Sequence, residues 1–487
     1  MHRLRGGQRI LYYGCVVGHG QDLASFHGDR SRERKWRMSC QRLQSLTNGR
    51  KLSKNPPAQR RVCATVTIMR SLEQARHNRP RIALYSSGMV GLGHMRRNLL
   101  IAQALARSRL RSVNLLIAES REATAFVNAM PPGTDCLTLP ALRKDANGHC
   151  QARYLNVGLN DLVKLRAETI RAALEAFDPD LLIVDYLPRG ALCELDSALD
   201  TLRYRGRTRF VLGLRDVLGD PVSVSKNWST PTNEEAIRVY YDQVWVYGDS
   251  KVYDPILEYR LPSDLASKIR FTGYLDQRLR IDTSPPEDDD CLDALGLPAG
   301  SFVLCVVGGG QDGDRLAESF AGAEFPRGMT GVVVAGPFMS LETRRDLRER
   351  AFLNPRLRVF DFLAEPTCLV SRAERVISMG GYNTICEVLS FEKRALIVPR
   401  TKPRGEQLLR AERLRNLGLV DLLHPDKLDS QALSKWMRRD LLAPVVRKRI
   451  DLIGHLVIPR LVKELLGGYP HVGRAKVHEL ETSHAIH

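Results

Sequence analysis

The sequence of 487 residues lacks several features that would assign it to a class at once. It has no Cys-x-x-Cys pair and no cysteine and histidine cluster at metal-ligand spacing, which argues against zinc, iron–sulfur and dithiol redox sites. No apolar run approaches the ~18 residues that a membrane-spanning helix needs. A short apolar run near the N-terminus is broken by glycine and has no convincing cleavage site, so a signal peptide is not expected.

Cysteines are present but scattered. There are ten, and Cys305 in VLCVV and Cys386 in TICEV lie among apolar residues. This distribution is typical of buried, reduced thiols, so we expect a cytoplasmic protein.

The charge is concentrated at one end of the chain. The formal net charge is +18, but residues 1–78 hold 16 Lys and Arg against 4 Asp and Glu, a formal +12. The rest of the chain is therefore close to an ordinary charge balance. The basic character belongs to an N-terminal extension, and it says little about the folded part of the protein.

Residues 1–78 have no sustained helical or strand periodicity. Two explanations stay open: a disordered basic arm, or sequence translated upstream of a true start at Met69, which we favour. A non-catalytic protein that binds a partner through the arm is one alternative function. Nucleic acid is not the expected partner because the arm lacks the interleaved aromatic residues of a stacking surface.

From residue 81 the chain alternates short apolar runs with helical patterns. Such runs are typical of buried parallel strands joined by helices. The first set of predicted strands is 81–87, 113–118, 180–187, 209–216, 243–248 and 270–276, with a helix over 94–108. The Pro-rich acidic stretch 282–290 then interrupts the pattern, which restarts with predicted strands at 301–310, 331–338, 357–363, 375–381 and 394–400.

Two such arrays predict an α/β fold with two doubly wound domains facing each other across a cleft. The expected boundaries are an N-terminal extension (1–78), a first domain (79–281), a linker (282–300), a second domain (301–467) and a tail (468–487). Doubly wound sheets bind ligands beyond the carboxyl ends of their strands, so the site is expected in the cleft. The amphipathic stretch 434–466, which contains Pro444 and Pro459, is expected to form helix that packs back across the domains; a membrane-surface helix is the alternative.

The stretch SMGGYNTICEVL, residues 378–389, joins a predicted strand to a helix expected to begin around Asn383–Thr384. Gly380 and Gly381 let the backbone approach an anion, and a helix N-terminus offers unpaired N–H groups with partial positive charge. Asn383 and Thr384 can add donors, and Glu387, one turn further on, can reach hydroxyl groups. The stretch fits a nucleotide diphosphate with its ribose, although taken alone it also fits an ordinary glycine-assisted turn.

The loop VPRTKPRGEQ, residues 398–407, follows the next predicted strand. Arg400, Lys402 and Arg404 can neutralise phosphate, and Glu406 and Gln407 can accept from and donate to sugar hydroxyls. The alternative is a basic loop followed by the acidic start of a helix.

The stretch SSGMVGLGHMRRN, residues 86–98, is a second glycine-rich turn between strand and helix. A histidine here is often structural, but His94 at the carboxyl end of a strand is also well placed as a general base. Asp185, at the end of LLIVD, or Asp216, in GLRDVLGDP, can orient its imidazole. The sequence leaves the choice open.

Together these motifs resemble the GT-B glycosyltransferases, particularly the MurG-like (family 28 type) group. The resemblance covers about residues 80–465 and is most specific in GLGH (91–94), VVGGGQDG (306–313) and the block from Gly380 to Gln407. It implies two Rossmann-like domains, the second of which binds a nucleotide sugar, usually a UDP sugar. It also implies an inverting hexosyltransferase reaction without a catalytic metal ion, without a cofactor, and with an acceptor that is often lipid-linked, hence possible peripheral membrane contact.

The resemblance also implies roles for particular residues. His94 is implied as the base that deprotonates the acceptor. From the residues alone, we place Asp185 with it as the second catalytic candidate. The implied donor-binding residues hold the diphosphate (Gly380, Gly381, Asn383, Thr384), the ribose (Glu387), the donor sugar (Glu406, Gln407), the phosphate side of the cleft (Gly309, Gly310, Gln311) and the base (Phe362, Leu363), with Arg404 in the basic loop.

The sequence departs from the family at the first turn. GLGHMRRN is shorter than the GGTGGH pattern of the cell-wall enzymes and is closer to the GxGHxxR of UDP-sugar hydrolases of nonulosonic acid synthesis, in which the histidine activates water. Hydrolysis of a UDP sugar is therefore an alternative to transfer, and the sugar and the acceptor, a glycan or a lipid-linked molecule, stay unassigned. Asp288-Asp289-Asp290 matches the DxD of metal-dependent transferases, but it lies in the linker with no strand before it, so no metal site is expected.

Overall fold

The computed structural model describes residues 79–86, 93–119, 129–144, 149–227, 231–281, 292, 295–297, 301–310, 312–363, 365–402, 405–440 and 442–467. All of these residues belong to one compact unit. The basic extension, the Asp288–Asp290 run and the tail 468–487 lie outside the described residues, so the predictions made for them stay predictions.

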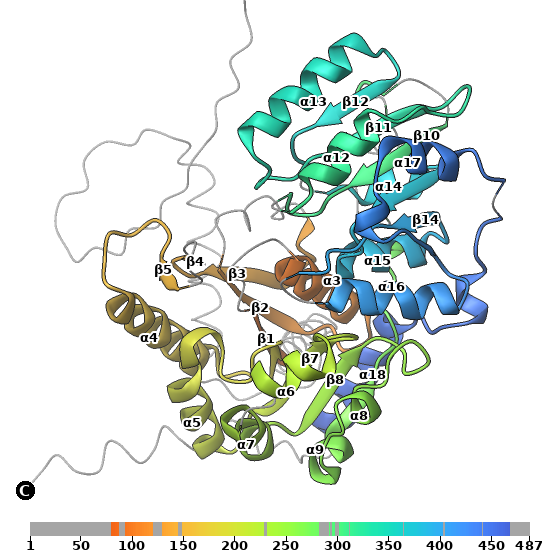
Figure 1. Ribbon diagram of the computed structural model, residues 1–487. Coiled ribbons are helices and arrows are strands. Elements are labelled where there is room, and N and C mark those ends of the chain that lie inside the picture. Colours follow the sequence, from red (N-terminus) through yellow and green to blue (C-terminus); the bar gives the residue numbers. More distant parts are fainter. Residues whose placement is uncertain are drawn as a thin grey trace, which may run out of the picture. The chain divides into compact units, whose positions relative to one another are not determined.

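The first half of the described chain is built on a parallel sheet with the order β3-β2-β1-β6-β7-β8-β9 (Figure 1). Its strands are β1 (Arg81–Ser86), β2 (Val113–Ala118), β3 (Thr134–Thr138), β6 (Leu181–Asp185), β7 (Arg209–Arg215), β8 (Gln243–Tyr247) and β9 (Ile269–Phe271), and a small antiparallel hairpin joins β4 (Leu142–Lys144) to β5 (Cys150–Ala152). The helices are α3 (Gly93–Arg107), α4 (Leu159–Phe177), α5 (Asp196–Arg205), α6 (Pro221–Asn227), α7 (Pro231–Tyr240), α8 (Pro255–Glu258), α9 (Ser263–Lys268) and α10 (Arg278–Ile281), with a 3₁₀ turn at Ala191–Cys193.

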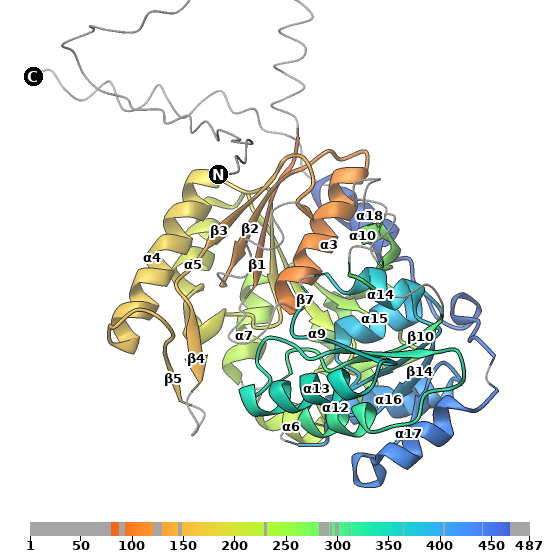
Figure 2. The ribbon, with the colours of Figure 1, turned by 90° about the horizontal axis from the view of Figure 1, so that it is seen from above.

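Helices cover both faces of this sheet, because successive side chains of a strand point to opposite faces. Ile82 and Leu84 of β1 pack in one apolar cluster with Leu99 of α3. Ala83 and Tyr85 point the other way and pack in a second cluster that includes residues of α4 and α5. Figure 2 shows α3 on one side of the strands and α4 and α5 on the other. Burial on both faces explains why β1 is a continuous apolar run.

The second half repeats the plan with a parallel sheet in the order β12-β11-β10-β13-β14-β15. Its strands are β10 (Phe302–Val306), β11 (Thr330–Val334), β12 (Leu357–Phe360), β13 (Arg375–Ser378), β14 (Arg394–Ile397) and β15 (Asp421–Leu422). Its helices are α12 (Asp314–Ala321), α13 (Leu341–Leu353), α14 (Thr367–Arg372), α15 (Tyr382–Ser390), α16 (Glu406–Asn416) and α17 (Ser430–Met437), with 3₁₀ turns at Pro425–Lys427 and Val446–Lys448. The prediction of two doubly wound parallel sheets is confirmed.

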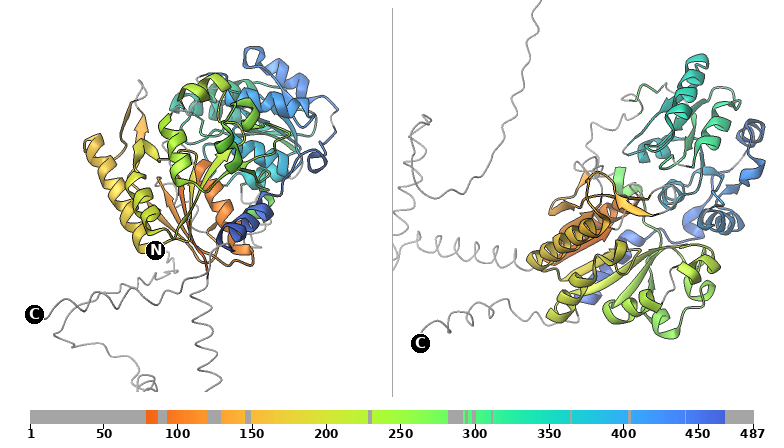
Figure 3. Two further views of the ribbon diagram at one scale, coloured as in Figure 1. Left: turned by 90° about the horizontal axis from the view of Figure 1, so that it is seen from below. Right: turned by 60° about the vertical axis from the view of Figure 1, so that its left-hand side comes forward.

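The last helix, α18 (Gly454–Gly467), returns to the first half and packs against α3. The left panel of Figure 3 shows this dark blue helix beside the orange α3. The return is fixed by backbone hydrogen bonds, because the Tyr274 N–H donates to the Asp451 carbonyl and the Gly454 N–H donates to the Tyr274 carbonyl. Packing of the C-terminal helix across the halves agrees with the sequence expectation.

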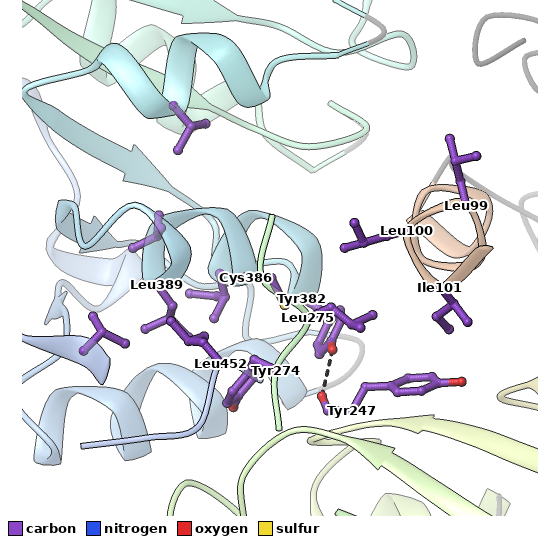
Figure 4. Close-up of a cluster of buried hydrophobic side chains, with 14 of the residues drawn as sticks. Leu99, Leu100, Ile101, Tyr247, Tyr274, Leu275, Tyr382, Cys386, Leu389 and Leu452 are labelled. Atoms are coloured by element: carbon purple, nitrogen blue, oxygen red, sulfur yellow. Dashed lines mark hydrogen bonds between the residues drawn. The ribbon is translucent and has the colours of Figure 1, made fainter. Parts of the chain in front are cut away.

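Apolar side chains of α15 and of the first half share one buried cluster, shown in Figure 4. The Tyr382 hydroxyl, from α15, donates a 2.7 Å hydrogen bond to the backbone carbonyl of Tyr247 in β8. A buried hydroxyl that crosses between the two halves fixes their register at this point. The start of α15 is therefore held against the first sheet.

The sequence did not predict β3, β15 or the β4–β5 hairpin. β3 lies at the edge of its sheet and its residues are only half buried, so it lacks the apolar run of the central strands. The predicted strand 270–276 is wrong beyond Phe271. The predicted helix 434–466 is divided, since α17 ends at Met437 and α18 begins only at Gly454, with Pro459 inside it.

The expectation of buried, reduced cysteines holds only in part. Cys305 and Cys386 are buried and free, but the free Cys193 is exposed. Cys368 is disulfide-bonded, so the expectation is wrong for that residue. Among the helices that the structure describes, none is both long and apolar enough to cross a membrane.

Candidate active site

Both halves concentrate polar groups where the strand order of the sheet reverses. In the first sheet β1 lies beside β6, and in the second sheet β10 lies beside β13. Ligands of doubly wound sheets bind beyond the carboxyl ends of the strands at such a point. The predicted catalytic residues follow β1 and end β6, and the predicted diphosphate-binding residues follow β10 and β13.

His94 and Asp185 meet at the first of these points. Ser86 and Asp185 are register partners at the carboxyl ends of β1 and β6, and His94 is the second residue of α3. The His94 Nδ1 atom lies 2.6 Å from the Asp185 Oδ2 atom. Of the two carboxylates that the sequence left open as partners of His94, the structure brings Asp185 to the imidazole.

Asp216 has another partner. Its carboxylate accepts hydrogen bonds from Arg410 of α16 at 2.8 to 3.0 Å and from the Tyr274 hydroxyl at 2.7 Å. Asp216 and Arg410 are both fully buried. This pair therefore joins the end of the first sheet to a helix of the second half, and a buried pair of this kind leaves a costly uncompensated charge if one member is removed.

Arg97, one helical turn after His94, completes the first cluster. Its Nη2 atom donates to both Asp185 oxygens, at 2.8 and 2.6 Å. Burial alone would raise the pKa of Asp185, but the charge of Arg97 and the hydrogen-bonded contacts with Arg97 and His94 outweigh burial and lower it to about 2. Asp185 is therefore ionised near neutral pH, and it can only accept hydrogen bonds.

The state of His94 follows from its partner. Because Asp185 accepts, the proton of the 2.6 Å contact is on His94 Nδ1, which leaves Nε2 with a free lone pair. Burial lowers the pKa of His94, Asp185 partly opposes that effect, and the nearby Arg97 and Arg215 lower it further. The imidazole is thus neutral near pH 7, which is the form a general base requires.

The second point is built mainly from backbone. Gly380 has φ +77°, and an added Cβ would lie 2.6 Å from the Ile397 Cγ2 atom, so glycine is required there. Gly381 caps α15 and has no side chain to accept from its first N–H groups, so the helix start has no N-cap side-chain hydrogen bond in the described part of the chain. The helix begins at Tyr382, a residue earlier than predicted. Uncapped N–H groups at a helix start form a site for an anion.

A cavity of about 280 Å³ connects the two points. Its lining includes, from the first half, Gly93, His94, Arg96, Arg97 and Arg215, and from the second half Gly308, Gly309, Phe338, Phe362, Leu363, Gly381, Tyr382, Asn383 and Thr384. The structure thus brings seven of the predicted site residues to one cavity: His94, Gly309, Phe362, Leu363, Gly381, Asn383 and Thr384.

The other predicted residues that the structure describes do not line the cavity. Asp185, Gly310, Gly380, Glu387, Glu406 and Gln407 are not among the residues that line the cavity. Gly310 is packed closely, since an added Cβ would lie 2.4 Å from the Ala335 carbonyl oxygen. Gln311 and Arg404 lie outside the described residues.

Glu387 is engaged by the first half of the chain. Its buried Oε1 atom accepts from Arg96 Nη2 at 2.6 Å and from the Thr367 hydroxyl at 2.9 Å, whereas Oε2 has no hydrogen-bond partner among the described residues. Arg96 also pairs with Glu365 at 2.7 Å, and Arg280 pairs with Glu365 at 2.8 Å. A buried carboxylate oxygen without a partner is able to accept from a ligand hydroxyl.

Glu406 and Gln407, at the start of α16, are held by Arg400. The Arg400 Nη2 atom donates to Glu406 Oε1 at 2.9 Å, and the Arg400 backbone N–H donates to Gln407 Oε1 at 2.9 Å. Arg400 also reaches Asp312 at 2.7 Å. The basic loop is therefore tied to the acidic start of the helix that follows it. This is the arrangement of the alternative interpretation, a basic loop followed by the acidic start of a helix.

Sequence reasoning missed the roles of Arg96, Arg97 and Glu365 as partners of the predicted site residues. Arg97 had a signal, because a residue three positions after His94 on a helix shares its face. Arg96 and Glu365 are separated by 269 positions, and nothing local in the sequence relates them.

Comparisons with known proteins find a family match in the second half of the chain. Residues 303–444 match the glycosyltransferase family 28 C-terminal domain. A 146-residue stretch is 30% identical to the UDP-N-acetylglucosamine--N-acetylmuramyl-(pentapeptide) pyrophosphoryl-undecaprenol N-acetylglucosamine transferase of Rubrobacter xylanophilus, and it spans 30% of this chain and 41% of that relative.

Solved structures share the fold over most of the chain. The glycotransferase of kitacinnamycin is 15% identical with a TM-score of 0.52, covering 79% of this chain and 98% of that chain. UDP-GlcNAc 2-epimerase from Neisseria meningitidis bound to UDP-GlcNAc is 14% identical with a TM-score of 0.51, covering 80% and 100%. Likeness at this identity shows the fold, which is GT-B. Residues 303–444 thus match the family 28 glycosyltransferase C-terminal domain within a chain that has the GT-B fold, and the chain matches less than half the length of its curated relative.

Proposed function

We propose that the protein transfers a sugar from a UDP sugar to a hydroxyl group of an acceptor, with inversion at the anomeric carbon and without a catalytic metal ion. The observation that carries the proposal is the pairing of a neutral, carboxylate-oriented His94 with the uncapped start of α15, both of which line one cavity. The family 28 match over residues 303–444 supports a sugar nucleotide as the donor.

In this proposal, His94 Nε2 takes the proton of the acceptor hydroxyl as its oxygen attacks the anomeric carbon. Asp185, held by Arg97, stabilises the imidazolium that forms. The attack comes from the face opposite the departing UDP, and inversion follows. Backbone N–H groups around Gly381–Thr384 stabilise the negative charge that develops on the diphosphate.

The remaining predicted residues have supporting roles in the proposal. Glu387 would accept from the ribose through its unpartnered Oε2, Glu406 and Gln407 would contact the donor sugar, and Phe362 and Leu363 would flank the base. These assignments stay proposals. Glu406 also has a buried oxygen, Oε2, without a hydrogen-bond partner, which is consistent with a ligand hydroxyl at that position.

A panel of nucleotide sugars in a thermal-shift assay on the full chain tests donor binding. A UDP sugar should raise the melting temperature, because a ligand at about 100 times its Kd stabilises the folded state by about 2.7 kcal/mol. A panel in which no UDP sugar shifts the melting temperature, or in which only sugars of another nucleotide do, would contradict the proposed donor.

Hydrolysis is the second candidate, because the same neutral His94 can take a proton from water and the GLGHMRR turn resembles that of UDP-sugar hydrolases. Incubation of the protein with the stabilising UDP sugar and no acceptor separates the two. If free sugar and UDP are released in equal amounts and at the same rate when no acceptor is present, hydrolysis is favoured. UDP release that rises many-fold when a hydroxyl acceptor is added favours transfer. Peripheral contact with a membrane remains a proposal from the family, whose acceptors are often lipid-linked.

A further inference from the structure

Arg215 differs from the other arginines of the cavity. It is the last residue of β7 and lines the cavity together with His94. Its guanidinium makes no hydrogen bond or ion pair with any residue that the structure describes, and its Nε atom is buried without a partner. The contact it does make is with the face of the Tyr186 ring, 5.4 Å from the guanidinium carbon to the centroid.

The neighbouring cations are already neutralised. Arg96 pairs with Glu365 and Glu387, and Arg97 pairs with Asp185. Arg410, which also lies near Arg215, is bound to Asp216. No aspartate or glutamate is among the residues that line the cavity in the described part of the chain. Among the described residues no carboxylate forms an ion pair with Arg215; Glu406 is near enough to raise its pKa, but the Oε1 atom of Glu406 is already bound to Arg400.

A cation that is partly buried without an ion-pair partner is unfavourable unless a ligand supplies the opposite charge. Burial lowers the pKa of Arg215, and the like charges of Arg97 and Arg410 lower it further. Arginine stays protonated all the same, so the site is positive at neutral pH. Its planar fork, with terminal nitrogens that no described residue occupies, suits a bidentate contact with a phosphate or a carboxylate.

The position of Arg215 indicates which substrate carries that anion. Arg215 stacks on Tyr186, and the Tyr186 ring lies 6.3 Å from the His94 ring, so the free cation is on the side of the general base. The donor diphosphate already has the uncapped start of α15 in the other half. We propose that Arg215 binds a phosphate or carboxylate group of the acceptor, so that the acceptor is an anionic molecule held by that group next to the hydroxyl that His94 deprotonates.

This inference rests on the proposed function, which makes the ligand beside His94 the acceptor. Binding of an anion by Arg215 can nevertheless be tested separately. The probe is inorganic phosphate, titrated into the full chain saturated with UDP at constant ionic strength, with chloride as the salt control. Wild type, R215Q and R215K are compared by calorimetry. The matched control is R270Q, which removes an exposed arginine that bonds only to backbone carbonyls.

We expect phosphate affinity to fall at least tenfold in R215Q and three- to tenfold in R215K, and to stay within twofold in R270Q. UDP affinity should stay within twofold in all three variants. Unchanged phosphate affinity in R215Q, or wild type that binds phosphate no better than chloride, overturns the proposal. A tenfold loss of UDP affinity in R215Q also overturns it, because Arg215 would then serve the donor.

A second measurement does not depend on the folding of a variant. Phosphate should slow the reaction of Arg215 with an arginine-specific dicarbonyl reagent in the UDP-bound wild type, as read from the modified peptide by mass spectrometry. Modification at an unchanged rate overturns the proposal. If the wild type does not bind UDP at all, the proposed function fails, whereas the same titration without UDP still decides whether Arg215 binds phosphate.

Discussion

The two halves of the protein have the same strand plan but use its reversal point differently. In the first half, side chains occupy the point: His94, Asp185 and Arg97 form a hydrogen-bonded cluster with one free imidazole nitrogen. In the second half, backbone occupies it: Gly380 and Gly381 open the way to the uncapped N–H groups of α15. The comparison teaches that, under the proposed function, one fold supplies a site for proton transfer in one half and a site for an anion in the other.

The largest effect is expected from His94→Ala. Removal of a general base lowers turnover by on the order of 10²–10⁴. UDP release from the donor found by thermal shift measures turnover, and UDP affinity, measured by calorimetry, should change less than twofold because the anion site is in the other half. Full activity in this variant would break the division of labour between the halves.

Asp185→Asn should lower turnover by on the order of 10²–10⁴, because the amide neither fixes the Nδ1 proton nor stabilises the imidazolium. It also leaves Arg97 without its ion-pair partner, so the variant must first be shown to fold by its thermal transition. Asp216→Asn is the matched comparison, since Asp216 does not contact His94 but bonds Arg410. It should destabilise the protein and leave the turnover of the folded fraction closer to wild type; equal turnover losses in both variants would contradict the role of Asp185.

Gly380→Ala tests the backbone site. The new Cβ meets Ile397 and has a φ that alanine disfavours, and strain of about 1–3 kcal/mol is expected there. We expect the start of α15 to shift and relieve that strain. UDP affinity should then fall by roughly tenfold, and turnover at saturating donor should change little. Gly418→Ala is the control, because it has φ +65° but nothing within 4 Å of the added atom. Equal UDP affinity in the two variants would remove Gly380 from the donor site.

Glu387→Gln should weaken donor binding by about fivefold, because it replaces a hydrogen bond to a charged group with one to a neutral group, a difference of about 1 kcal/mol. Because Glu387 also neutralises Arg96, the control must disturb that network and keep the Glu387 carboxylate. Thr367→Val does so, since it removes the hydroxyl that donates to the same Oε1 atom. Donor KM from initial rates measures the effect. A larger effect for Thr367→Val than for Glu387→Gln would make the role structural.

The smallest effect is on the pH profile. The pKa of His94 is lowered, so the neutral form persists below pH 6.5 and the acid limb of kcat/KM should lie below that value. Asp185 raises the His94 pKa and Arg215 lowers it, so the limb should move to lower pH in Asp185→Asn and to higher pH in Arg215→Gln. Movement in the same direction in both variants would contradict assignment of the limb to His94.

Local sequence patterns were enough to predict the central strands of the two sheets. The buried strands β2 and β7 were predicted to within a residue, because burial on both faces requires a continuous apolar run. The edge strand β3 was missed, since half-buried residues give no such run. The glycine turns located His94 and Gly380 for the same local reason: backbone geometry at a strand–helix junction restricts which residues fit.

The sequence by itself determined the two doubly wound halves and the positions of His94 and of the glycine turn before α15, because these depend on neighbours in the chain. Only the tertiary structure decided that Asp185 rather than Asp216 meets His94, that Arg96 reaches Glu387, and that Arg215 keeps an unpaired charge in the cavity. These facts concern residues up to 291 positions apart. Partner choice among buried charges depends on distance and desolvation in three dimensions, which no local pattern encodes.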